Sequence, residues 1–145
     1  MKTTTTATPP TWFWIVSAIA LIWNLMGVFA YLADAYMSIE DLEQMSQAQR
    51  LLYESQPAWV TGAYAIAVWG GALGCVLLLL RTKWARAILY LSLLGIVAQL
   101  SYSIFLSNSL EVYGPVGLIM PIMVLCIGIA LVVFANKAIA KGWLR

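Results

Sequence analysis

Four long apolar runs, separated by polar connections, dominate the pattern of the chain. They cover residues 12–33, 58–80, 85–106 and 115–135, and Arg86, at the start of the third run, is their only charged residue. A helix needs about 20 apolar residues to cross roughly 30 Å of hydrocarbon, so each run is long enough to span a membrane. The pattern predicts an all-α integral membrane protein, a four-helix bundle forming a single domain over residues 1–145.

The connection between the first two runs has a helical pattern of its own. Ser38 can cap a helix with Asp41 three residues later. Beyond it, apolar residues recur on one side at helical spacing, and acidic and other polar residues occupy the other side. We expect a short amphipathic helix over residues 38–54 that lies in the membrane interface, either as a packing element or as a moving lid.

Charged residues divide between the two sides of the predicted bundle. Lys and Arg near span ends accumulate on the cytoplasmic side of a membrane. Seven of the eight basic residues flank the runs on one side, whereas all six acidic residues lie on the other, with Arg50. We therefore expect both termini in the cytoplasm and residues 38–54 in an extracytoplasmic loop. Residues 1–10 have no apolar pattern and two prolines, which predicts a disordered tail.

Composition excludes several function classes. Hydrophobic residues make up 63% of the chain and charged residues 10%, and there is no histidine. Bis-histidine haem ligation, histidine-zinc sites and the usual general base of hydrolases are therefore absent. The two cysteines lie in separate apolar runs without a CxxC motif. We expect no enzyme activity, metal site or cofactor, and the near balance of charge gives no sign of a nucleic-acid surface.

A few polar and aromatic residues in the apolar runs could shape a binding site. Asn24 and Gln99 each carry an amide that lipid cannot satisfy. Aromatic residues lie at similar or shallower depth, so the predicted ligand-binding residues are Asn24, Tyr31, Tyr64, Trp69, Gln99 and Tyr102. They could line a small cavity that opens outward. The alternative is that the two amides bond across helices, a contact worth about 0.6 to 2 kcal/mol.

Small residues and one proline indicate how the helices pack. A stripe of small side chains recurs at helical spacing along the second run, at Ala63, Ala67, Gly70 and Gly74. Such a stripe lets another helix approach closely, either another span or another copy of the chain. In the fourth run, Pro121 removes an amide donor and frees the carbonyl of Gly117. That predicts either an accommodated kink or a carbonyl that can coordinate a ligand.

Several segments resemble a group of small bacterial inner-membrane proteins, some of which carry the label sugar transporter. The segments are Trp23-Asn24-Leu25-Met26-Gly27, Pro57-Ala58-Trp59, Ala67-Val68-Trp69-Gly70-Gly71-Ala72-Leu73-Gly74, Arg81-Thr82-Lys83-Trp84-Ala85 and Lys141-Gly142-Trp143. The likeness covers nearly the whole chain. It implies a bacterial inner-membrane protein with the four-helix layout, and it adds no catalytic residue.

These observations together favour a non-enzymatic protein of the bacterial inner membrane. We expect it to bind or transport a small neutral or amphipathic molecule, with a sugar as one candidate, through the outward-opening cavity. Four helices rarely enclose a transport path alone, so this interpretation also predicts a homodimer. The alternative is a structural or accessory subunit that docks on a larger membrane complex through the small-residue stripe of the second run. In either case the lipid bilayer is a partner.

Overall fold

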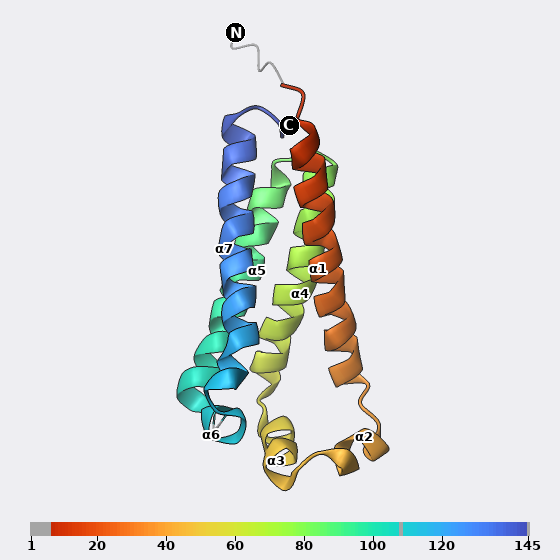
Figure 1. Cartoon of the computed structure of the whole chain (residues 1–145), viewed down its shortest axis with the longest axis vertical. Helices are drawn as coiled ribbons and strands as arrows, with labels where there is room; N and C mark the ends of the chain where they lie inside the picture. Colours follow the sequence, from red (N-terminus) through yellow and green to blue (C-terminus); the bar gives the residue numbers. More distant parts are fainter. Residues whose placement is uncertain (1–6, 108, 145) are drawn as a thin grey trace.

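Four long helices run side by side along the length of the molecule. The computed structural model describes residues 7–107 and 109–144, and the long helices are α1 (Thr11–Ala35), α4 (Ala58–Leu79), α5 (Trp84–Ser101) and α7 (Ile119–Ala140) (Figure 1). A π-helical segment, η1 (Tyr102–Leu106), extends α5, and a 3-10 segment, η2 (Pro115–Leu118), precedes α7. Within the described residues there is no strand. The predicted all-α four-helix bundle is confirmed.

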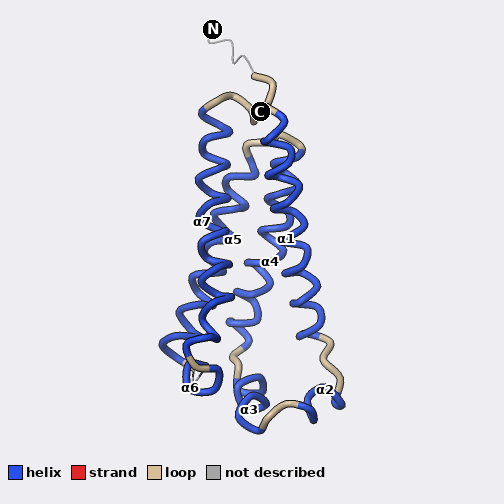
Figure 2. Tube along the Cα trace, in the orientation of Figure 1, coloured by secondary structure: helices blue, strands red, loops and turns tan. Residues whose placement is uncertain are grey.

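Each of the four long helices is long and apolar enough to cross a membrane. α4 packs against α1 and α5, and α5 packs against α7. The loops are short and lie at the two ends of the bundle (Figure 2). We call the end that holds Ala7 and Leu144 the terminal end, and the opposite end, where α2, α3 and α6 lie, the loop end (Figure 1).

The small-residue stripe of α4 packs on α5 of the same chain. A Cβ added at Gly70 would lie 3.2 Å from the Cβ of Ser92, and one at Gly74 would lie 2.6 Å from Cδ2 of Leu89. Gly95 of α5 contributes from the other side, because a Cβ there would lie 2.7 Å from the carbonyl oxygen of Ala63. Ala63 and Ala67 are buried. The partner of the small-residue stripe is therefore the neighbouring span of the same chain, α5.

Large side chains fill the bundle near the terminal end. Phe13 of α1 is fully buried, and its ring stacks on Phe134 of α7 with centroids 5.5 Å apart. Trp143 meets Phe13 edge-on at 5.6 Å. These rings join α1 to α7, and the buried core continues below them through Leu78, Leu131, Val132 and Ala135. This half of the bundle is closed.

The N-terminal segment is attached to the terminal end. Residues 1–6 of the predicted disordered tail lie outside the described residues, but the prediction is wrong for residues 7–10. The amide of Ala7 donates to the carbonyl of Gly142 over 3.0 Å. Arg81, in the turn between α4 and α5, donates from Nη2 to the Ala7 carbonyl at 3.0 Å and from Nε to the Trp143 carbonyl at 2.9 Å. One guanidinium therefore holds both ends of the chain.

The predicted helix over residues 38–54 is two helices, α2 (Ile39–Gln44) and α3 (Gln47–Ser55). The predicted cap is present, because the Asp41 amide donates to the Ser38 hydroxyl over 3.1 Å. A single helix is wrong because Ser46 starts a second one. Its hydroxyl accepts from the Gln49 amide at 3.2 Å, and the Gln49 side chain accepts from the Ser46 amide at 3.4 Å. This capping box satisfies the first amides of α3 and ends α2.

Pro121 does not interrupt the interior of the fourth span. The backbone changes from 3-10 helix to α-helix at Ile119, so Pro121 lies in the first turn of α7. The first amides of an α-helix have no partner within the helix, and proline is tolerated there because it removes none of the interior hydrogen bonds. The kink predicted at Gly117 and Pro121 stays a prediction. Gly117 lets the backbone approach Tyr113 closely, because a Cβ at position 117 would lie 2.6 Å from the Cβ of Tyr113.

Candidate binding cavity

A cavity of about 430 Å³ lies between the four long helices. Ligand pockets of proteins commonly enclose about 300 to 1,000 Å³, so this one has room for a small molecule. It is lined by Trp23, Asn24, Met26, Gly27, Ala30, Asp34, Tyr64, Ala67, Val68, Leu89, Ser92, Ile96, Gln99, Leu100, Met120, Pro121, Val124, Ile127, Gly128 and Leu131. Leu89 and Leu131 also belong to the buried core. The core of the terminal half is therefore the floor of the cavity.

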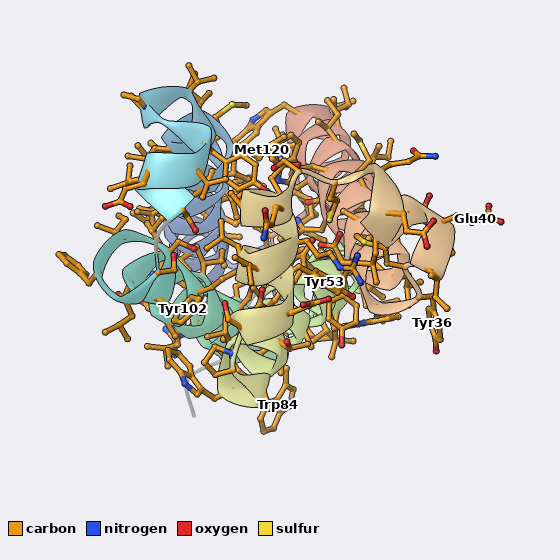
Figure 3. All side chains as sticks on the ribbon, turned by 90° about the horizontal axis from the view of Figure 1, so that it is seen from below. Tyr36, Glu40, Tyr53, Trp84, Tyr102 and Met120 are labelled. Carbon is orange, nitrogen blue, oxygen red and sulfur yellow. The ribbon has the colours of Figure 1, made fainter. Side chains whose placement is uncertain are left out.

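The cavity opens between α1 and α7. Met26 of α1 and Met120 of α7 both line it, and each is 60% exposed. Figure 3, viewed from the loop end, shows Met120 on the side where α7 faces α1. The same view shows α3 crossing the loop end of the bundle. Both helices are apolar enough to span a membrane, and in a membrane this lateral opening would face lipid.

Asn24 is held against α4 at the inner part of the cavity. Its Nδ2 donates to the Ala20 carbonyl at 2.8 Å and to Sγ of Cys75 at 3.5 Å. Its Oδ1 lies directly over Gly71, where any Cβ would overlap it. Among the described residues no donor reaches Oδ1, so this oxygen can accept a hydrogen bond from a ligand.

Gln99 faces the same cavity from α5. It is half-buried, and its amide makes no hydrogen bond to any group within residues 7–107 and 109–144. The predicted alternative, in which Asn24 and Gln99 bond across helices, holds only for the weak contact from Asn24 to Cys75. Ser92, in contrast, uses its hydroxyl fully, donating to the Ala67 carbonyl at 2.6 Å. Among the described residues, the hydrogen-bonding groups of the wall that stay unused therefore include those at Asn24, at Gln99 and at the hydroxyl of Tyr64.

Tyrosines and a carboxylate lie toward the mouth of the cavity. Tyr64 of α4 lines it, and Tyr31 of α1 packs edge-on against Tyr64 with ring centroids 5.3 Å apart. Asp34, in the last turn of α1, also lines the cavity. Sequence analysis placed Asp34 beyond the first span with the other outer acids, because the apolar run ends at residue 33. The helix continues to Ala35 and brings the carboxylate to the mouth.

Three predicted binding residues, Tyr31, Trp69 and Tyr102, do not line this cavity. Trp69 is 49% exposed and faces away from it on α4. Tyr102 begins η1, where it meets Trp59 edge-on at 5.7 Å. It lines a second hollow of about 210 Å³ at the loop end, together with Asp34, Met37, Met45, Gln49, Leu52, Tyr53, Gln56, Ser107, Ser109 and Tyr113. Asp34 is common to the two spaces.

The cavity offers binding groups without a set of catalytic partners. Within the part of the chain that the structure describes, no three His, Cys, Asp or Glu side chains gather to hold a metal ion. Asp34 is the only ionisable carboxylate on the wall, and no basic side chain lines it. The arrangement can therefore bind and orient a molecule through hydrogen bonds, apolar contact and one negative charge.

Comparison with known protein families, curated proteins and solved structures gives no significant match. The resemblance to small bacterial inner-membrane proteins therefore stays a prediction.

Proposed function

We propose that this protein binds a small amphipathic molecule in the cavity between its four helices and performs no chemistry on it. The observation that carries the proposal is the composition of the wall. Most lining residues are apolar, and three hydrogen-bonding side chains, Asn24, Tyr64 and Gln99, converge on the space from different helices. A mostly apolar pocket with a few convergent polar groups is typical of small-molecule sites.

The same wall argues for an amphipathic ligand over a sugar. Every hydroxyl of a buried sugar needs a hydrogen-bond partner, because an unpaired polar group costs about 1 to 3 kcal/mol. Asn24 and Gln99 offer too few partners for such a molecule. A ligand with one polar end and an apolar body matches the wall better, and the opening between Met26 and Met120 lets it arrive from the bilayer.

We also propose an orientation and an assembly. Arg81, Lys83, Arg86, Lys137 and Lys141 lie at the terminal end, which supports a cytoplasmic terminal end in a bacterial inner membrane. The rings of Phe13 and Phe134 close that end, so passage across the membrane would need a rearrangement or a second copy. We expect a homodimer if the protein transports its ligand, and native mass spectrometry from nanodiscs measures the copy number.

An accessory-subunit function has less support. That alternative depended on the small-residue stripe of α4 as a docking face for another protein. Because Ser92 and Leu89 of α5 already cover Gly70 and Gly74, the stripe is not exposed to a partner. We therefore propose only the binding function.

The test uses a substitution on α1 that fills the cavity, and it measures ligand binding with a spectroscopic reporter at a residue that lines the cavity. Ala30 lines the cavity, whereas Ala18 is an equally exposed alanine of α1 outside the lining. Ala30→Phe places a ring in the space, and Ala18→Phe is the matched control. The chain, labelled with 5-fluorotryptophan and reconstituted in nanodiscs, is titrated with 1-decanol. The fluorine resonance of Trp23, assigned by its loss in Trp23→Phe, reports the cavity.

We expect a saturable shift of the Trp23 resonance in the wild type and in Ala18→Phe, and its loss in Ala30→Phe. Trp84, which is exposed at the terminal end, serves as the reporter for simple partition of decanol into lipid. If the wild type shows no saturable shift, or if Ala30→Phe binds as the wild type does, the proposed function is wrong.

A further inference from the structure

Asp34 occupies a position that helix stability does not explain. It lies in the last turn of α1, where the partial negative charge of the helix end repels a carboxylate. The hydroxyl of Tyr53 donates a hydrogen bond to the backbone carbonyl of Asp34 at 2.7 Å, and not to its carboxylate. In the described part of the chain no ion pair or hydrogen bond reaches that carboxylate, since the one ion pair found there joins Arg50 to Glu54.

The segment that begins at Asp34 contains more acidic than basic residues. Between residues 34 and 80 the sequence holds a single basic residue, Arg50, and Glu54 already pairs with it at 3.0 Å. The other acids of this segment are Glu40, Asp41 and Glu43. An unpaired carboxylate at the mouth of the cavity attracts ions of the opposite sign and repels like charges.

The space behind Asp34 is long and apolar. Asp34, Ala30, Gly27 and Trp23 line it along one side of α1, and eleven residues of helix correspond to about 16 Å. Tyr64 lies on the wall beside this path, and Tyr31 supports its ring. Aromatic faces attract cations as well as apolar groups. The cavity therefore combines a carboxylate and aromatic rings at its mouth with an apolar body.

From this combination we infer that the cavity selects amphiphiles with a cationic head, which lies at Asp34 and Tyr64 while the tail extends along α1 toward Leu131. This inference rests on the proposed binding function and adds the charge of the ligand to it. Asp34 is exposed at the mouth, so solvent screens its charge and the preference is greatest at low ionic strength.

The experiment compares three probes with the same ten-carbon tail. Decyltrimethylammonium, 1-decanol and decyl sulfate are titrated into nanodiscs of zwitterionic lipid, with the fluorine resonance of Trp23 as the reporter. We expect decyltrimethylammonium to bind about tenfold more tightly than decanol at low salt, and decyl sulfate to bind most weakly. Raising the salt concentration should reduce the advantage of the cation in the wild-type protein.

Matched variants assign the preference to one carboxylate. Asp34→Asn should lower the affinity for decyltrimethylammonium about tenfold and leave decanol binding unchanged, which also shows that the variant is folded. Asp41→Asn removes the same charge from α2, outside the lining, and should behave as the wild type does.

The outcomes separate the two proposals. If decanol binds but the cation binds no better, or if the two variants lose the cation equally, the charge selectivity is wrong and the binding function stands. If none of the three probes gives a saturable shift, both proposals fail. If Asp34→Asn also loses decanol binding, the salt dependence of the wild-type protein is the deciding measurement. A preference for decyltrimethylammonium over decanol that salt does not change contradicts a role for the Asp34 carboxylate.

Discussion

The two halves of this bundle are built from the same four helices, yet one is filled and the other is hollow. Near the terminal end, α1 and α7 meet through the stacked rings of Phe13 and Phe134. Toward the loop end, the same two helices present Gly27, Ala30 and Gly128 to the space between them. The hollow half also contains large residues such as Trp23 and Met120, so the difference is that small residues stand among them on both helices.

The contrast shows how a membrane protein can hold an open site. Lipid chains are as apolar as the helices, so burial does not drive the helices together. Where large side chains interlock, the helices stay in contact. Where they are small, α4 and α5 still press together through Gly70, Gly74 and Gly95, but α1 and α7 leave a cavity. Three substitutions test this division, in order of decreasing expected effect.

The largest effect is expected at the tight seam between α4 and α5. Gly95→Ala would place a Cβ 2.7 Å from the Ala63 carbonyl oxygen and 2.9 Å from the Ala67 amide nitrogen. Both are backbone atoms that cannot move aside, so we expect a loss of about 3 kcal/mol in the free energy of unfolding. Gly62→Ala is the control, because nothing lies within 4 Å of its added Cβ. Reversible unfolding in mixed detergent micelles measures both, and equal stabilities would contradict the close seam.

A second substitution opens the filled half. Phe13→Ala removes a fully buried ring that contacts Phe134 and Trp143. We expect a loss of about 2 kcal/mol, below the 3 to 5 kcal/mol found in water-soluble cores, because the ring gains nothing by leaving lipid. Phe29→Ala, at a ring that is 69% exposed, should change stability little. The same unfolding assay compares them, and a Phe13→Ala variant as stable as Phe29→Ala would remove the contrast between the halves.

The smallest effect concerns the hydrogen bond between α4 and α5 beside the cavity. Ser92→Ala removes a buried hydroxyl that donates to the Ala67 carbonyl at 2.6 Å. Hydrogen bonds between membrane helices contribute about 0.6 kcal/mol on average, so we expect a loss of about 1 kcal/mol or less. Ser101→Ala, whose hydroxyl bonds only to its own helix at Val97, is the control. A loss of several kcal/mol would mean that this bond, and not the glycines, holds the seam.

The spans and the helix cap were predictable because each depends on local properties. Length and hydropathy determine where a helix can cross a membrane, and Ser38 caps α2 as its spacing from Asp41 indicates. The break at Ser46 also has a local signal, since Ser46 and Gln49 have the spacing of a capping box. The apolar pattern continues across this break and therefore predicts one helix where the chain forms two.

The faces of the spans were not predictable, because a helix that is apolar all round gives no periodicity that distinguishes its sides. Tyr64 and Trp69 were grouped by depth, yet five residues on a helix turn through about 140°, and only Tyr64 lines the cavity. Tyr102 was displaced for another reason. Its ring meets Trp59 of α4 and lines the second hollow at the loop end, a contact that depth along the span does not indicate.

The bonds at the terminal end affect the order in which the chain can fold during synthesis. The Ala7 amide bonds to the Gly142 carbonyl, and Arg81 bonds to the carbonyls of Ala7 and Trp143. A ribosome makes residue 142 after all four spans, so the start of α1 has no final partner until the fourth span has been made. Contacts of such large sequence separation form late. Of the four spans, α1 is thus made before the other three, and its contacts at the terminal end form after them.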